Sequence, residues 1–140
     1  MIRVLTVAAL AFAVASCGEP AGEDAAPAAG ATDAAPAPAA DAALARAPAA
    51  FVQCKTCHAV APGKHGVGPS LAGVHGTKAG EIPGYAFSGA MKASGLTWDD
   101  ATLDRFLERP MQTVPGTKMV YPGLKDPAKR AEVIAYLKTI

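Results

Sequence analysis

The 140-residue chain lacks several patterns that define common classes of protein. No stretch alternates apolar and polar residues as a half-buried strand would, which argues against a sheet-based fold. The one long apolar run, Val4 to Ala15, is about a dozen residues and too short to cross a bilayer as a helix. Residues 18–50 contain no aromatic residue and a single large aliphatic one, Leu44, so this part cannot form a core of its own. The sequence therefore predicts an all-α fold that is confined to residues 49–140.

The N-terminus has the features of an export signal. Met1–Arg3 is short and positively charged, and the apolar run ends in Val14-Ala15-Ser16-Cys17, which resembles a bacterial lipobox. We expect a lipoprotein-type signal peptide over residues 1–16 and acylation of Cys17, which would anchor the chain to a membrane. The alternative is ordinary secretory cleavage after Ala15, which would leave Cys17 as a free thiol. Both alternatives export the chain to an oxidising compartment.

Residues 17–48 are predicted to be a flexible tether. Residues 18–50 contain 17 alanines and 5 prolines, and the prolines at positions 27, 36, 38 and 48 interrupt every alanine run. A chain of some 30 residues of this kind spans about 30 Å on average, which would let a folded domain move between membrane-bound partners. A passive spacer is compatible with the same composition.

The central motif of the folded part is Cys54-Lys55-Thr56-Cys57-His58. Two cysteines three residues apart, followed at once by a histidine, are the attachment signature of a c-type haem. Each thiol can form a thioether with a haem vinyl group, and the histidine then supplies one axial ligand to the iron. A dithiol or zinc site is the alternative, but zinc needs a fourth ligand and residues 58–140 contain no further cysteine.

Short helices separated by long loops are predicted around this motif. The helices are expected at 49–57, 89–94 and 99–108, with a last one after Asp126, and Ser88, Thr97 and Asp126 are the predicted N-caps. Pro110 should end the third helix, and residues 111–119 should be loop. Loops as long as 59–84 are unusual in a small domain. They are reasonable if a large apolar cofactor forms the core that they wrap.

Residues 51–140 resemble the class I c-type cytochromes, which are small mono-haem proteins. The resemblance rests on six segments: Phe51–His58, Gly68–Leu71, Pro83–Ser88, Gly95–Trp98, Val114–Met119 and Ala131–Lys138. It implies a cytochrome c fold over residues 49–140 and one covalently attached haem c. It also implies the following residue roles: Cys54 and Cys57 hold the haem, His58 and Met119 are the metal ligands, the Pro69 carbonyl accepts a hydrogen bond from His58, and Trp98 and Thr117 lie near a haem propionate.

Four positions depart from the pattern of that family. The resemblance implies polar side chains where this chain has Phe87, Met91 and Phe106, and an arginine where it has Thr77. Loss of a cation beside a propionate should lower the reduction potential, whereas a drier pocket should raise it. The sequence does not show which of these two opposite effects on the reduction potential is larger.

Two further histidines and several lysines are candidates for roles around the haem site. His65 resembles a histidine that joins two loops, whereas no partner was identified for His75, and neither is expected to bind iron. Exposed lysines are candidates for a basic ring around the haem edge, namely Lys55, Lys64, Lys92 and Lys118. Residues 51–140 carry eleven basic and seven acidic residues, a net charge of +4, which suits docking to acidic partners. An ordinary solvated surface is the alternative.

The resemblance implies a non-enzymatic carrier of single electrons in a respiratory or photosynthetic chain. The expected partners are a quinol–cytochrome c oxidoreductase as donor and a terminal oxidase or reductase as acceptor. We expect a monomer without a nucleic-acid partner, on the periplasmic side of a bacterial membrane, lipid-anchored or else soluble. A haem peroxidase or gas sensor is the alternative function, but it needs an open iron position, and Met119 argues against one.

Overall fold

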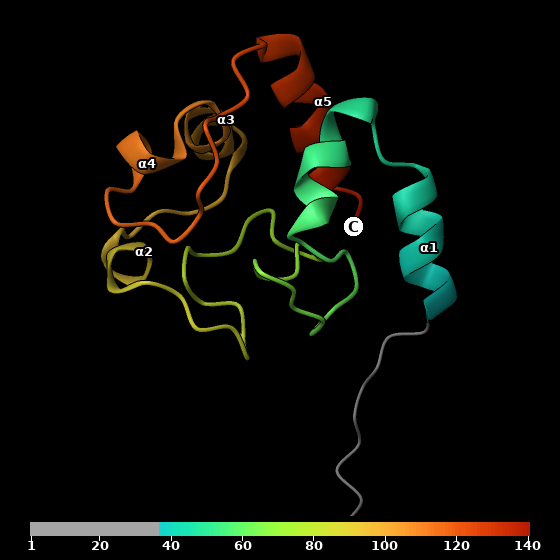
Figure 1. Ribbon diagram of the computed structural model, residues 1–140, viewed down its shortest axis with the longest axis horizontal. Helices are drawn as coiled ribbons and strands as arrows, with labels where there is room; N and C mark the ends of the chain where they lie inside the picture. Colours follow the sequence, from blue (N-terminus) through green and yellow to red (C-terminus); the bar gives the residue numbers. More distant parts are fainter. Residues whose placement is uncertain (1–36) are drawn as a thin grey trace, which may run out of the picture. The chain divides into compact units, whose positions relative to one another are not determined.

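The computed structural model describes residues 37–140, and within them every regular element is helical (Figure 1). The expected signal peptide, Cys17 and the first part of the predicted tether lie outside the described residues. The elements are α1 (Ala37–Ala45), η1 (Ala49–Thr56), α2 (Gly89–Ala93), α3 (Asp100–Glu108), α4 (Pro110–Thr113) and α5 (Pro127–Leu137). Across 37–140 the extended backbone pairs only in an isolated bridge, Lys78 with Thr97. The predicted all-α class is confirmed.

None of the helices between residues 37 and 140 is long and apolar enough to cross a membrane. Two of these helices begin at the predicted cap residues. Ser88 caps α2 by accepting a hydrogen bond from the Met91 amide, and Asp126 caps α5 by accepting from the amides of Ala128 and Lys129. Both caps confirm the prediction.

The start of α3 and the segment after it differ from the expectation. The cap of α3 is Asp99 rather than Thr97, because the Asp99 carboxylate accepts a hydrogen bond of 2.7 Å from the Thr102 amide. That bond lowers the pKa of the Asp99 carboxyl. Pro110 does not lead into a loop but opens the one-turn helix α4, a position at which proline loses no hydrogen bond.

The C-terminal helix α5 contacts both η1 and α3, and this crossing forms the centre of the core (Figure 1). Phe51 of η1 is 0% exposed, and its ring meets that of Tyr136 edge-on, with 4.7 Å between the ring centroids. Val133, on the same face of α5, is buried in the same cluster. Phe51 and Val133 therefore join η1 to the last helix.

The prediction of a flexible tether is wrong for residues 37–48, which fold onto the rest of the domain. Ala43 of α1 is buried, and the Tyr136 hydroxyl donates a hydrogen bond of 2.9 Å to the Ala43 carbonyl. The prolines do not prevent the helix, because Pro38 lies in its first turn and Pro48 follows its end. Alanine, the best helix former, fills most of the positions between them.

Candidate functional site

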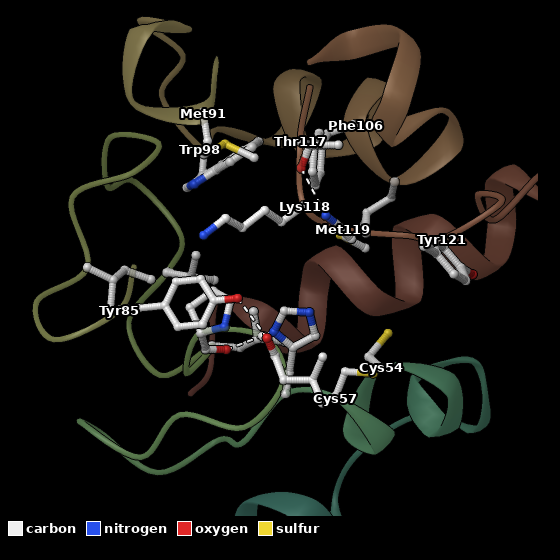
Figure 2. Close-up of a pocket in the computed structure, with 18 of the residues that line it drawn as sticks. Cys54, Cys57, Tyr85, Met91, Trp98, Phe106, Thr117, Lys118, Met119 and Tyr121 are labelled. Carbon is white, nitrogen blue, oxygen red and sulfur yellow. Dashed lines mark hydrogen bonds between the residues drawn. The ribbon is translucent and has the colours of Figure 1, made fainter. Parts of the chain in front are cut away.

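A cavity of 390 Å³ lies between η1, the chain from η1 to α3 that includes α2, then α3, α5 and the segment that follows α4 (Figure 2). Most of the side chains that line it are apolar or aromatic, and they come from every one of these segments. They include Phe51, Leu71, Val74, Ile82, Phe87, Met91, Trp98, Leu103, Phe106, Leu107, Val133 and Leu137. A planar apolar group could therefore fill this cavity and form part of the core. The length of the loops in the sequence already indicated such a group.

One side of the cavity is formed by the end of η1. Cys54 and Cys57 both line it as free thiols, Cys54 partly buried and Cys57 exposed. The amides of Cys57 and His58 both donate to the Cys54 carbonyl, at 3.1 and 2.9 Å, which closes a tight turn. Burial raises the pKa of the Cys54 thiol. The turn brings two thiols and one imidazole to the same side of the cavity.

His58 is held in one orientation by the loop that faces it. Its Nδ1 donates a hydrogen bond of 2.7 Å to the Pro69 carbonyl, which confirms the predicted contact. Burial lowers the pKa of the His58 imidazole, and the bond to Pro69 offsets part of this effect. A Cβ on Gly68 would overlap the His58 ring, so the loop fits closely against the imidazole. The remaining nitrogen, Nε2, is left with a lone pair that can bind a metal.

The other side of the cavity carries Met119, with Thr117 and Phe106 beside it (Figure 2). The Met119 amide donates to the Thr117 hydroxyl at 3.2 Å, and Lys118 reaches across the cavity mouth to the Ala86 carbonyl at 2.7 Å. These two bonds hold residues 117–119 in place. A thioether sulfur is thus presented to the same cavity as the His58 imidazole.

The structure also shows where Trp98 lies, which was predicted to be near a propionate, and where the four positions lie that depart from the family pattern. Trp98 is buried and lines the cavity, with its ring 4.8 Å from that of Phe106. Phe87 and Met91 also line the cavity, so these departures do make the pocket more apolar. Thr77 is not among the lining residues, and its hydroxyl donates to the Val74 carbonyl at 2.7 Å.

His65 joins two loops, as expected. The Ser70 amide donates to its Nδ1 at 3.1 Å, so Nε2 carries the proton and donates to the Pro83 carbonyl at 3.0 Å. His75, for which the sequence indicates no partner, has one in the structure. Its Nε2 lies 2.8 Å from Asp100, whose other carboxylate oxygen lies 2.5 Å from the Lys138 ammonium. No local sequence signal connects His75 to Asp100, 25 residues away.

Two tyrosines near the site were missed by sequence reasoning. The Tyr85 hydroxyl donates to the Val67 carbonyl at 2.7 Å, and Tyr121 lines the cavity beyond Met119. Burial raises the pKa of the Tyr121 phenol. For Tyr121, the only signal in the sequence is its position two residues after Met119, a candidate ligand.

The residues present fit a covalently held haem. The cavity offers two thiols with the spacing of the attachment motif, an imidazole with one free nitrogen, a thioether and an apolar lining. A zinc ion would use the thiols but leave the large apolar space unexplained. These features define a class of small, all-helical proteins that hold one haem.

Comparisons with known proteins agree with this class. The family model described as Cytochrome c matches residues 42–140. Cytochrome c2 iso-2 of Magnetospirillum fulvum is 57% identical over 94 residues, which cover 67% of this chain and 98% of the relative. Cytochrome c2 of Rhodomicrobium vannielii is 61% identical over 90 residues, 64% of this chain and 72% of the relative.

A solved structure, that of cytochrome cH from Methylobacterium extorquens, has a TM-score of 0.62 and 55% sequence identity, covering 72% of this chain and 98% of the other. The chain belongs to the cytochrome c family. It is a cytochrome c2-like mono-haem electron carrier rather than an enzyme, and its cofactor is covalent haem c.

Proposed function

We propose that this chain carries single electrons through one low-spin haem ligated by His58 and Met119, in the periplasm. The donor would be a quinol–cytochrome c oxidoreductase and the acceptor a terminal oxidase or reductase. The observation that carries the proposal is that His58 and Met119 line one apolar cavity, with the second nitrogen of His58 already bound to Pro69. Bound there, the haem would supply a reversible one-electron iron couple.

Cys54 and Cys57 would hold the haem through thioethers, one to each vinyl group. His58 would bind the iron through Nε2. Because its Nδ1–H donates to the Pro69 carbonyl, the ring has a fixed orientation and its ligating nitrogen is more basic. The close fit of Gly68 against the ring prevents the imidazole from rotating away.

Met119 would be the second protein ligand of the iron, together with His58. A soft thioether favours the ferrous state and so raises the reduction potential relative to a second imidazole. With His58 and Met119 both bound to the iron, the protein would leave no position for a peroxide or a gas. This is the reason to prefer a carrier over the alternative of a haem peroxidase or gas sensor.

Polar contacts to the haem would be few. The Trp98 indole N–H and the Thr117 hydroxyl are candidates to donate toward the haem propionates, and both residues line the cavity. Thr117 can do this while it accepts from the Met119 amide, because a hydroxyl is both donor and acceptor. The rest of the lining excludes water and favours the less charged ferrous haem.

Partner docking would occur at the open edge of the cavity. Val67 and Val120 line it and are 79% and 91% exposed, an unusual exposure for two aliphatic side chains beside a cofactor site. Lysines at positions 55, 64, 92 and 118 supply positive charge to residues 51–140, which suits a partner with an acidic surface. The binding would weaken as salt is added.

Membrane attachment through an acylated Cys17 remains part of the proposal. Because α1 begins at Ala37, the tether would be limited to about 20 residues and would span about 25 Å on average. Mass spectrometry of the mature N-terminus tests it. A diacylglycerol adduct on Cys17 supports the anchor, and a chain beginning at residue 16 with a free thiol supports the soluble periplasmic alternative.

Carbon monoxide binding tests the choice between carrier and haem enzyme. A reduced protein with Met119 on the iron should bind carbon monoxide slowly and weakly at neutral pH. Rapid, tight binding would show an open iron position and would overturn the carrier proposal in favour of the enzyme or sensor.

A further inference from the structure

Arg130 of α5 is a buried charge outside the cavity, and the function proposed above does not use it. It is 7% exposed. Its guanidinium pairs side-on with the Asp104 carboxylate, with Nε 2.7 Å from Oδ1 and Nη2 3.3 Å from Oδ2. Its Nη1 donates to the carbonyls of Leu124 and Lys125, at 2.9 and 3.0 Å. A single side chain therefore joins α3, α5 and the segment between α4 and α5.

That segment carries Met119. Residues 119–125, here called the Met119 strap, run from the proposed iron ligand to the start of α5. The far end of the strap is bound to the end of α3 as well, because the Leu124 amide donates to the Leu107 carbonyl at 2.8 Å and the Lys125 ammonium to the Glu108 carbonyl at 2.6 Å. Gly123 has a φ of 96°, and a Cβ there would overlap the Glu108 carbonyl oxygen. The strap thus lies in close contact with α3.

The same helix α3 forms one wall of the cavity. Leu103, Phe106 and Leu107 line the cavity from it, while Asp104 lies on the side that meets Arg130. For Met119 to leave the iron, the strap must move relative to α3. Arg130 resists this movement because its Nη1 holds two strap carbonyls while Nε and Nη2 hold Asp104 of α3.

We propose that Arg130 is a positioning residue for Met119: by fixing the strap to α3, it sets how readily the sixth iron position opens to outside ligands. The inference rests on the proposed ligation of iron by Met119. Charge-assisted hydrogen bonds contribute more to stability than neutral ones, and Arg130 makes several with two backbone carbonyls and a carboxylate. Loss of this side chain should therefore open the strap more often in the ferric protein.

Imidazole, which binds ferric iron only where Met119 has left it, is the probe. Arg130→Met in the full-length holoprotein should raise the affinity for imidazole about tenfold, the equivalent of one lost charge-assisted hydrogen bond. Arg130→Lys keeps the charge but loses the planar fork, so it should raise the affinity by a smaller factor. The Leu124 amide should also exchange its hydrogen faster, whereas the Lys138 amide, at the other end of α5, should not.

A purely structural role is tested with a matched variant on the same helix. Tyr136→Phe removes the hydrogen bond to Ala43 but touches neither the strap nor α3's last carbonyls. It should lower the free energy of unfolding while changing the imidazole affinity less than about twofold. Each affinity is compared with the unfolding free energy of the same variant.

Three outcomes would overturn the inference. Unchanged imidazole affinity in both Arg130 variants would do so, and so would a rise in Tyr136→Phe as large as that in Arg130→Met for the same loss of stability. A wild-type ferric protein without the charge-transfer band of methionine ligation would overturn the proposed ligation, and the inference with it. If Arg130→Met does not fold, Arg130→Lys and the exchange of the Leu124 amide decide.

Discussion

The His58 Nδ1 atom lies 2.7 Å from the carbonyl oxygen of Pro69, and the residue before that proline, Gly68, has no room for a side chain against the same ring. The two features act together. The carbonyl sets the direction of the ring and the close backbone keeps it there, so the Nε2 atom proposed to bind the iron has a fixed position. An imidazole with this support has one hydrogen-bonded and one metal-binding nitrogen.

Gly68→Ala should disturb that arrangement. The added methyl group would overlap the His58 ring, which forces the loop or the imidazole to shift at a cost of about 1–3 kcal/mol. We expect a lower free energy of unfolding and a lower yield of attached haem, measured by denaturation and by absorbance. Gly89→Ala is the control, because nothing lies within 4 Å of its added methyl group and its φ is not positive. Equal effects in both variants would contradict the explanation.

Phe51→Ala should weaken the crossing of η1 and α5. The side chain is fully buried against Tyr136, so its loss leaves a cavity and should cost about 3–5 kcal/mol of unfolding free energy. Chemical denaturation of the holoprotein measures this. Val52→Ala, at a neighbouring site that is 52% exposed, should change stability by less than about 0.5 kcal/mol. A small loss in the Phe51 variant would show that another contact holds the crossing.

Phe106→Tyr should shift the midpoint potential of the haem. Phe106 lines the cavity beside Met119 and its ring packs on Trp98, so the added hydroxyl enters an apolar part of the pocket. A dipole there would stabilise the more charged ferric state of the bound haem. We expect a lower potential by redox titration. An unchanged titration together with an unchanged methionine charge-transfer band would count against the role given to this position.

The Asp100 carboxylate should make the free energy of unfolding depend on pH. Its hydrogen bonds to Lys138 and His75 hold the pKa of the Asp100 carboxyl below its ordinary value of 3.8. A carboxyl whose pKa is lower in the folded protein than in the unfolded chain stabilises the fold at pH values above its unfolded pKa. That contribution is lost as the pH falls through the folded pKa.

Asp100→Asn should therefore lower the melting temperature at neutral pH and have little effect in strong acid. The difference should also shrink in high salt, because all three groups are at least partly exposed. Glu132→Gln, at an exposed site on α5, is the control and should show no such pH dependence. A difference for Asp100→Asn that stays constant from neutral to acid pH would contradict the assignment.

The sequence predicted the local features of the site and missed the distant ones. The Cys54–His58 motif is contiguous, so its chemistry could be recognised without a structure. The Pro69 contact followed from the family resemblance. The pairs His75–Asp100 and Arg130–Asp104 join residues 25 and 26 positions apart, and nothing in the local pattern connects them.

The errors in the fold have similar physical causes. Thr97 and Asp99 are both good N-cap residues, and only tertiary contacts select Asp99, since Thr97 pairs with Lys78 instead. The sequence does not predict α1, because prolines usually interrupt a helix, whereas here Pro38 lies in the first turn and Pro48 follows the end. Its docking depends on the Tyr136 hydroxyl, almost a hundred residues away in the chain.

Redox titration of the wild type, Met119→His and Met91→Leu tests whether Met119 binds the haem iron. Both methionines line the cavity, so the pair separates ligation from burial. We expect a reversible one-electron couple in the wild type, a clearly lower potential in Met119→His because imidazole favours ferric iron, and a potential close to wild type in Met91→Leu. An unchanged potential in Met119→His, or loss of the wild-type couple in Met91→Leu, would contradict it.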